Sequence, residues 1–291
     1  MSNIILKFKA DEEVLLRDFL LLKKISRSTL TRIKFDEGGA ILVDGKEESV
    51  RYKLSAGQEV VVHLPKEEFS PNVRFIEGLL NVLFEDDYFM IIDKPADLPT
   101  IPARDKNDGS LLEIINYYFK EKGYESIPHI VTRLDRDTSG LVLVAKHRYV
   151  HSLFEDVDIE KIYLAICSGK APEEMIIEKN IGLAKDSIIE RVIDENGQYA
   201  KTQLSRLSYQ EKGDYSLIKL KLFTGRTHQI RLHCKSIGHG LLGDFLYGIE
   251  TDLINRQALH AHRLSFVHPV TKDLVNVVSD LHEDMRKIVE G

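Results

Sequence analysis

The sequence predicts an α+β protein, and two kinds of apolar spacing support this. In 161–169 the side chains of Ile162, Leu164 and Ile166 fall on one face, and in 215–223 those of Ile218, Leu220 and Leu222 do so again, which is the two-residue period of a strand. Apolar residues recur at helical spacing in 14–20 and in 111–118, so amphipathic helices occur between the strands. The chain should therefore combine sheets with separate helices.

A change in composition divides the 291-residue chain. Residues 66–80 contain charged residues, Ser70 and Pro71, and we interpret this stretch as a linker. We expect a small unit at residues 1–70, linker included, and a larger one at 71–291.

In the small unit, a short strand at 5–8 precedes two helices. Ser26 is the expected N-cap of the second helix, which should run to about Lys34 with its basic side chains facing away from Leu30 and Ile33. Gly38 and the glycine after it should end this helix. Strands should follow, around the turn dipeptides Asp44-Gly45 and Ala56-Gly57.

In the larger unit, the apolar runs 82–84 and 88–92 flank an acidic turn and predict a hairpin. A helix is expected over 147–156. Thr227 is the expected cap of a further helix that buries Ile230, Cys234 and Ile237 and ends at Gly238.

The net charge is −6, but basic residues are concentrated in two stretches. Residues 17–34 contain six Lys or Arg against one Asp, and residues 201–235 contain eight against two acidic residues. Such faces on an acidic protein suit RNA contact at particular surfaces. Solvated helix faces would have the same composition.

Cysteines and histidines form no recognisable metal motif. Cys167 and Cys234 lie in apolar segments and should be buried free thiols. His260 and His262 are the nearest approach to a ligand pair, and no third ligand lies at a suitable spacing, so no metal is expected. No apolar run is long enough to span a membrane, and residues 1–3 do not begin a signal peptide. A cytoplasmic protein is therefore expected.

Charged residues crowd the stretch from Arg133 to Gly140, which contains Asp135 and Asp137 and leads into the apolar segment 141–145. A polar loop at the end of a buried strand is a common place for catalytic groups. A solvated turn with local Asp–Arg pairing is the alternative.

This stretch resembles the H-R-L-D-x-x-T-S-G signature of the RluA family of RNA pseudouridine synthases, with Thr132 in place of the histidine. The resemblance implies that Asp135 is the essential catalytic residue. It also implies a catalytic domain built on a mixed, mainly antiparallel sheet with flanking helices and a central cleft.

Other stretches resemble further motifs of the same family. The pattern K-x-Y-x-A at 161–165 implies that Tyr163 stacks on the target base, and G-R-T-H-Q-I-R-x-H at 225–233 implies that Arg231 pairs with the catalytic aspartate. Arg226 is the weaker candidate for that pairing. Three more matches lie at 84–95, 238–248 and 259–269, with Asp97 in place of a glycine just after the first and Gly240 in place of a proline.

Several basic residues are implied to contact RNA. Arg133 would contact the backbone or fill the vacated stack, and Lys94 lies in the motif that supports the active-site loop, although a surface lysine at a strand end is as consistent with the sequence. Residues 1–66 resemble the αL RNA-binding module, which would place Lys24 and Arg27 on an RNA-binding face. A generic α+β domain is the alternative for that unit.

The expected function is isomerisation of specific uridines to pseudouridine in structured RNA, with large-subunit ribosomal RNA as the expected target. Transfer RNA is the alternative substrate, and a catalytically silent RNA-binding or ribosome-assembly factor is the alternative class. We expect a monomer with RNA as its partner and without a membrane, metal or cofactor.

Overall fold

The computed structural model describes residues 4–102, 109–185, 187 and 189–290. Residues 1–3, which entered the signal-peptide expectation, lie outside this set. Within the described residues, none of the helices has the length and apolar character needed to cross a bilayer.

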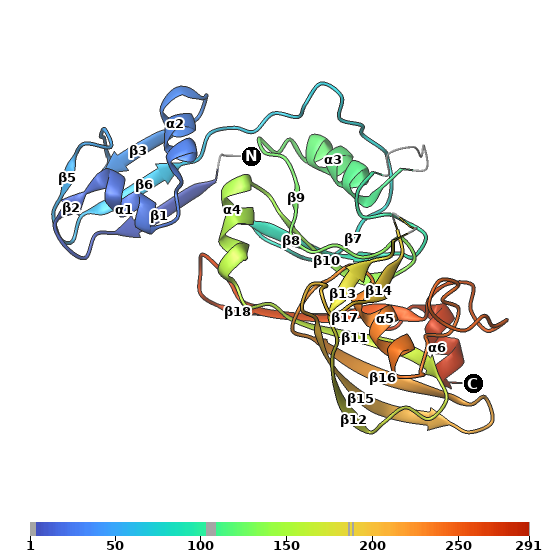
Figure 1. Ribbon diagram of the computed structural model, residues 1–291. Coiled ribbons are helices and arrows are strands. Elements are labelled where there is room, and N and C mark those ends of the chain that lie inside the picture. The colour runs from blue at the N-terminus through green and yellow to red at the C-terminus, as the bar shows by residue number, and fades with distance from the viewer. Residues whose placement is uncertain (1–3, 103–108, 186, 188, 291) are drawn as a thin grey trace.

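The N-terminal part of the chain forms a small sheet with two helices (Figure 1). Its elements are β1 (Ile5–Lys9), β2 (Val14–Leu15), α1 (Leu16–Leu22), α2 (Arg27–Phe35), β3 (Ala40–Val43), β4 (Lys46–Glu47), β5 (Lys53–Leu54) and β6 (Glu59–His63). Four strands pair in the order β1-β6-β3-β4, and β2 pairs separately with β5.

The second helix begins where the sequence predicts. The Oγ of Ser26 accepts a hydrogen bond from the Thr29 N–H at 3.1 Å, which satisfies one of the unpaired donors at the start of α2. Leu30 and Ile33 are buried, while Arg27 is exposed at the first helical position. Arg27 and Lys34 are therefore exposed as predicted, whereas Arg32 is half-buried and donates to the Lys66 carbonyl at 3.1 Å.

No helix or strand occurs between residues 64 and 80, where a linker is predicted, but this stretch packs against the rest of the protein. Glu67 is buried and accepts a hydrogen bond from His129 at 3.0 Å. The Tyr149 hydroxyl donates to the Lys23 carbonyl at 2.9 Å and joins the first helices to the larger part of the chain.

A ten-stranded sheet dominates the rest of the chain (Figure 1). Its first half contains β7 (Asn81–Glu85), β8 (Phe89–Lys94), α3 (Leu111–Lys122), β9 (His129–Ile130), β10 (Ser139–Ala145), α4 (Arg148–Leu153), a 3₁₀ turn (Phe154–Asp156) and β11 (Glu160–Ser168). The remaining elements are β12 (Glu174–Glu178), β13 (Ile181–Leu183), β14 (Arg191–Ile193), β15 (Lys201–Gln210), β16 (Tyr215–Leu222), α5 (Gln229–Ser236), β17 (Leu259–Val267), β18 (Leu274–Val278) and α6 (Glu283–Glu290). β13 and β14 pair apart from the large sheet.

The main path through the large sheet is β12-β15-β16-β11-β17-β10-β8-β7, with β18 paired to β17 and β9 to β10. Its pairs are antiparallel except for β10 with β17. The predicted mixed, mainly antiparallel sheet is confirmed. The predicted hairpin is β7–β8, and the two alternating segments are β11 and β16.

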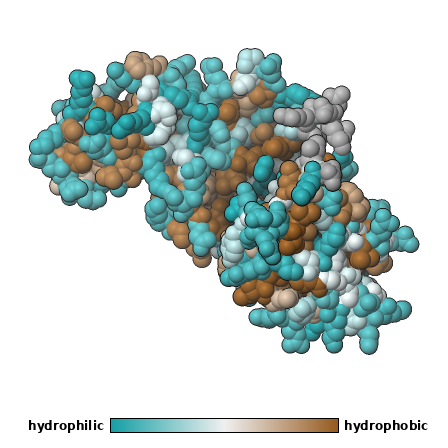
Figure 2. Space-filling view, viewed as in Figure 1, coloured by the Kyte–Doolittle hydropathy of each residue, from teal (hydrophilic) through white to brown (hydrophobic). Residues whose placement is uncertain are grey.

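Helices pack on both faces of the sheet at β11. Ala165 and Cys167 share a core cluster with Ile230 and Cys234 of α5, whereas Ile166 packs in another cluster that contains residues of α6. The alternation predicted for this strand is therefore confirmed. Both cysteines are free and buried, also as predicted. In Figure 2, hydrophilic residues cover most of the visible periphery and hydrophobic residues show through nearer the middle.

The parallel contact between β10 and β17 lies directly behind the charged loop. Gly140 pairs with Ala261 and has φ of +106°, a conformation that side chains rarely adopt. A Cβ at this position would collide with the Ala261 backbone. Glycine thus allows the charged loop to turn sharply into the most deeply buried strand.

Candidate active site

A cleft of about 520 Å³ lies where the loop before β10, strand β11 and the start of α5 meet. This volume is in the range of small-molecule sites. Five of the residues predicted from sequence line it: Arg133, Asp135, Tyr163, Arg226 and Arg231. The fold therefore gathers into one cleft residues that are distant in the sequence.

Asp135 has an ion-pair partner in this cleft. Its side chain is 30% exposed, and its Oδ2 lies 3.2 Å from Nη1 of Arg231, which is 5% exposed. The pairing predicted between these two residues is confirmed by this geometry. The carboxylate thus faces the cleft while it contacts a buried cation.

Asp244 holds the other side of Arg231. The Nε and Nη2 of Arg231 each donate to one Asp244 oxygen at 2.7 Å, a bidentate pair with Asp244 almost fully buried. Burial opposes the charge on Arg231, but the hydrogen bonds and the negative charge of Asp244 outweigh it and raise the pKa of the guanidinium. Burial likewise opposes the charge on Asp244, and Arg231 more than compensates, so the pKa of Asp244 is lowered.

His228 is a second neighbour of Asp135, with its Nε2 3.9 Å from Oδ2. The Tyr247 hydroxyl accepts from the Arg191 backbone N–H at 2.6 Å and lies 3.0 Å from Nδ1 of His228. Burial is the main cause that lowers the pKa of His228, so the ring is neutral at pH 7.

The start of α5 differs from the prediction. Thr227 does not cap the helix: His228 is the N-cap residue, in the left-handed conformation with φ of +58°. Instead, the Oε1 of Gln229 accepts from the Arg226 N–H at 3.0 Å and from the Thr224 hydroxyl at 2.8 Å. The left-handed residue places the His228 ring beside Asp135.

Tyr163 lies on β11 and lines the same cleft. Burial and, secondarily, the negative charge of Asp135 raise the pKa of its phenol. The hydroxyl therefore remains protonated at neutral pH. Lys161, two residues earlier on the same strand, also lines the cleft, and burial lowers its pKa. The sequence assigned no role to this lysine.

Three side chains bind consecutive parts of the Asp135 loop. The Thr100 hydroxyl donates to the Leu134 carbonyl at 2.8 Å, and Nη1 of Arg256 donates to the Asp137 carbonyl at 3.1 Å. Between them, the Nζ of Lys94 donates to the Arg136 carbonyl at 2.9 Å. The loop is thus held on both sides of the carboxylate.

Lys94 does not occupy the RNA-contact position predicted for it. Its side chain is fully buried, and its Nζ donates to the carbonyls of Pro95, Leu98 and Arg136 at 2.7–2.9 Å. Burial lowers the pKa of this amine to about 7. All three donors of the ammonium are used inside the protein, so Lys94 supports the loop from behind.

The other predicted RNA contacts lie on the surface in two places. Arg133 and Arg226 are exposed at the cleft, and Nε of Arg226 donates to the Tyr199 carbonyl at 3.0 Å. Lys24 and Arg27 lie on the N-terminal unit, on the far side of the molecule from α5 in Figure 1. Lys24 pairs with Asp156.

Comparisons with known proteins show the family of this chain. Residues 88–236 match the family model described as RNA pseudouridylate synthase. Uncharacterized RNA pseudouridine synthase YjbO of Bacillus subtilis is 38% identical over 272 residues, which cover 92% of this chain and 95% of that protein. The chain belongs to the RNA pseudouridylate synthase family.

Further relatives support the RluA-type assignment. Ribosomal large subunit pseudouridine synthase D of Zymomonas mobilis is 34% identical over 228 residues, 71% of each chain. Among solved structures, human RNA pseudouridylate synthase domain containing 1 aligns with a TM-score of 0.57 and 25% identity, over 73% of this chain and 94% of that one. The protein is an RNA pseudouridine synthase, and the alternative hypothesis of a catalytically silent RNA-binding factor is not supported.

The sequence motifs contained three residues whose positions in the site were not anticipated. Asp244 and Tyr247 are both in the 238–248 match, and His228 is in the 225–233 match, but their spacing gives no indication of their partners. Thr132, which replaces the family histidine, accepts from the Leu143 N–H at 2.9 Å and so has a backbone partner.

We predict that Asp244→Asn destabilises the synthase, because it leaves Arg231 without its buried bidentate anion. Breaking a buried pair in this way costs about 3–5 kcal/mol of unfolding free energy. The pKa of Asp244 is lowered, so its contribution is complete well above the ordinary Asp pKa of about 3.9 and is lost as the pH falls from there through the lowered pKa. Urea unfolding at pH 7 measures the loss. Asp18→Asn, at the exposed Arg17–Asp18 pair, is the control, and equal stability of the two variants would contradict the prediction.

We also predict that Lys94→Met lowers the rate constant of the chemical step without weakening RNA binding. A displacement of about 1 Å in the Asp135 loop should cost roughly a hundredfold in rate. Single-turnover kinetics and filter binding measure the two quantities separately. Lys120→Met, on the exposed surface of α3, is the matched control. A normal rate constant with weaker RNA binding would show instead that Lys94 reaches the RNA.

Proposed function

We propose that the synthase converts specific uridines of large-subunit ribosomal RNA to pseudouridine, with Asp135 as its catalytic residue. The supporting observation is the position of the Asp135 carboxylate, open to the cleft and 3.2 Å from the buried guanidinium of Arg231. The ribosomal target is supported by relatives named ribosomal large subunit pseudouridine synthase D.

The reaction rearranges a uridine without a net change in composition. The bond between ribose C1′ and ring N1 breaks, the ring turns, and C1′ forms a bond with ring C5. C5 loses its proton to solvent, and N1 gains one. Asp135 acts on the ribose, either as a nucleophile at C1′ or as a base for a sugar proton, and both roles require the ionised carboxylate.

Arg231 has the electrostatic role in this proposal. Its guanidinium donates a hydrogen bond to Asp135, and its position is set by Asp244 before substrate arrives. A preorganised charge needs no rearrangement during the reaction. Arg231 is therefore assigned to the catalytic set as the partner of Asp135.

Tyr163 is assigned to the base. A uridine must leave its stack to enter a cleft of this kind, and aromatic stacking recovers about 1–3 kcal/mol per base. The raised pKa of Tyr163 keeps its phenol neutral, so it does not repel the electron-rich ring by charge. Arg133, exposed at the cleft, is placed to bind the backbone or fill the vacated stack.

The N-terminal unit, residues 1–70, is assigned to RNA docking and residues 71–291 to catalysis. Arg27 on the small unit and Arg226 at the cleft supply separate positive surfaces for phosphates, whereas Lys24 is already paired with Asp156 and would have to exchange that partner for a phosphate. We further propose that the synthase acts in the cytoplasm. We also propose that it acts as a monomer, because all residues of the cleft come from one chain.

We predict that Asp135→Asn removes turnover while RNA binding persists. Its rate should fall by at least about a thousandfold, because the amide carries no negative charge. The measurement is tritium release from RNA labelled at uridine C5, since only C5 loses its hydrogen in the reaction. Full turnover by this variant would refute the catalytic assignment.

Pseudouridine mapping in cells tests which RNA is the target. Cells that lack the synthase should lose defined pseudouridines from large-subunit ribosomal RNA, and the wild-type gene, but not the Asp135→Asn gene, should restore them. Loss from transfer RNA alone would contradict the ribosomal target and leave the activity in place.

We predict that Arg27→Gln weakens RNA binding and reduces the salt dependence of affinity by about one unit of slope, as expected for one lost phosphate contact. The single-turnover rate at saturating RNA should not change, because Arg27 is remote from the cleft. Lys46→Gln, on β4 of the same unit, is the control. An unchanged affinity and slope for Arg27→Gln would remove this residue from the RNA-binding face.

A further inference from the structure

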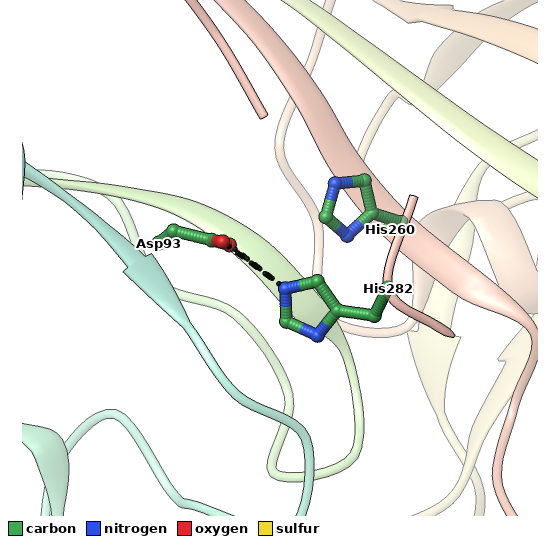
Figure 3. A group of neighbouring side chains, drawn as sticks. All are labelled: Asp93, His260 and His282. Carbon is green, nitrogen blue, oxygen red and sulfur yellow. Dashed lines mark hydrogen bonds and ion pairs between the residues drawn. The ribbon is translucent and has the colours of Figure 1, made fainter. Parts of the chain in front are cut away.

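Three side chains of types that can bind a metal ion meet beside Ser139, which follows the Asp135 loop. They are Asp93 at the end of β8, His260 on β17 and His282 just before α6 (Figure 3). One possible ligand atom from each lies within 4.8 Å of the other two. None of the three residues lines the cleft described above.

The hydrogen bonds of His260 place the lone pair of its ring on Nδ1. Its Nε2 lies 3.1 Å from the Ser279 carbonyl, which can only accept, so Nε2 carries the proton and Nδ1 has the lone pair. A ligand histidine commonly donates its other N–H to a backbone carbonyl in this way. The Ser139 hydroxyl, 3.0 Å from Nδ1, is its present partner and would have to turn aside.

The second histidine already faces the carboxylate. Nε2 of His282 lies 3.1 Å from both oxygens of Asp93, and Figure 3 shows the imidazole directed at that group and close to the His260 ring. The two ring centres are 5.0 Å apart. Asn81 also approaches one Asp93 oxygen, at 3.3 Å, and is compatible with carboxylate ligation.

We propose that Asp93, His260 and His282 form a binding site for one Zn²⁺ ion. Two imidazoles and one carboxylate are a recognised ligand set for zinc, whereas Mg²⁺ and Ca²⁺ prefer oxygen ligands alone. Tetrahedral bonds of about 2.0–2.1 Å place ligand atoms roughly 3.3 Å apart. The observed spread of up to 4.8 Å therefore requires only small side-chain movements, with water as the fourth ligand.

The site would join segments that are remote in the sequence. His282 leads into α6, whereas Asp93 precedes Lys94, and His260 contacts Ser139 four residues after Asp135. Bound zinc would therefore fasten the C-terminal segment to the strands that support the Asp135 loop. This inference does not depend on the RNA target or on the catalytic roles assigned above.

The test measures zinc binding to the full chain without an affinity tag, after chelator treatment. Zn²⁺ is titrated in competition with a chromogenic chelator, and bound metal is counted by mass spectrometry after desalting. We expect one equivalent per chain and a zinc-dependent rise in melting temperature, because a ligand that binds only the native state stabilises it. Absence of stoichiometric zinc would overturn the proposal.

Variants separate this site from other histidines. His282→Ala and Asp93→Asn should each weaken zinc binding by at least about a hundredfold. Loss of a residue that only hydrogen-bonds to a ligand already costs up to about a hundredfold in affinity, and loss of a ligand should cost at least as much. His262→Ala is the matched control, because His262 also bonds to the Ser279 carbonyl but is not a proposed ligand. If His282→Ala fails to fold, the zinc affinity of the near-isosteric Asp93→Asn variant decides whether the cluster binds zinc. Unchanged affinity in the folded ligand variants would show that the cluster is only a hydrogen-bonded network.

Discussion

The active site of this synthase depends on one guanidinium shared between two carboxylates. Arg231 is deeply buried, so its charge would be costly without a partner, and Asp244 compensates it with two short hydrogen bonds. That pair fixes the plane of the guanidinium, so the remaining Nη1 can point only toward Asp135. Asp244 thus determines where the cleft offers positive charge, although it does not line the cleft itself.

A second constraint is that the backbone carbonyls of the Asp135 loop need hydrogen-bond donors. Lys94 reaches the loop from the end of β8, and Arg256 reaches it from the segment before β17. Arg256 also makes a bidentate pair with Asp284 of α6, at 2.7 and 2.9 Å. The C-terminal helix therefore takes part in holding a loop that precedes it by more than a hundred residues. Buried polar groups that must all be paired leave the loop little freedom to shift.

Apolar spacing in the sequence predicted β7, β8, β11, β16 and the helices of the N-terminal unit, because it is a short-range signal, whereas the roles of the cleft residues came from the resemblance of the motifs to the RluA family. Both failed where the partner is remote. Lys94 resembles a surface lysine at a strand end, and only the fold reveals the three carbonyls around it. Thr227 is a plausible cap, yet Gln229 satisfies the local donors instead. The Asp93–His282 contact spans 189 positions, which no spacing rule covers.

The structure also changes how the basic stretches are understood. Within 201–235, several cations are already paired with carboxylates and contribute little net field: Lys201 with Glu178, Arg206 with Glu173, Lys221 with Glu160, and Arg231 with Asp244. Arg226 contacts a carbonyl through Nε, and no carboxylate partner is found for it in the part of the chain that the structure describes. A count of charges along the sequence therefore overstates the positive surface. Arg133 and Arg226 are exposed at the cleft, where an extruded uridine would enter and a phosphate could be bound.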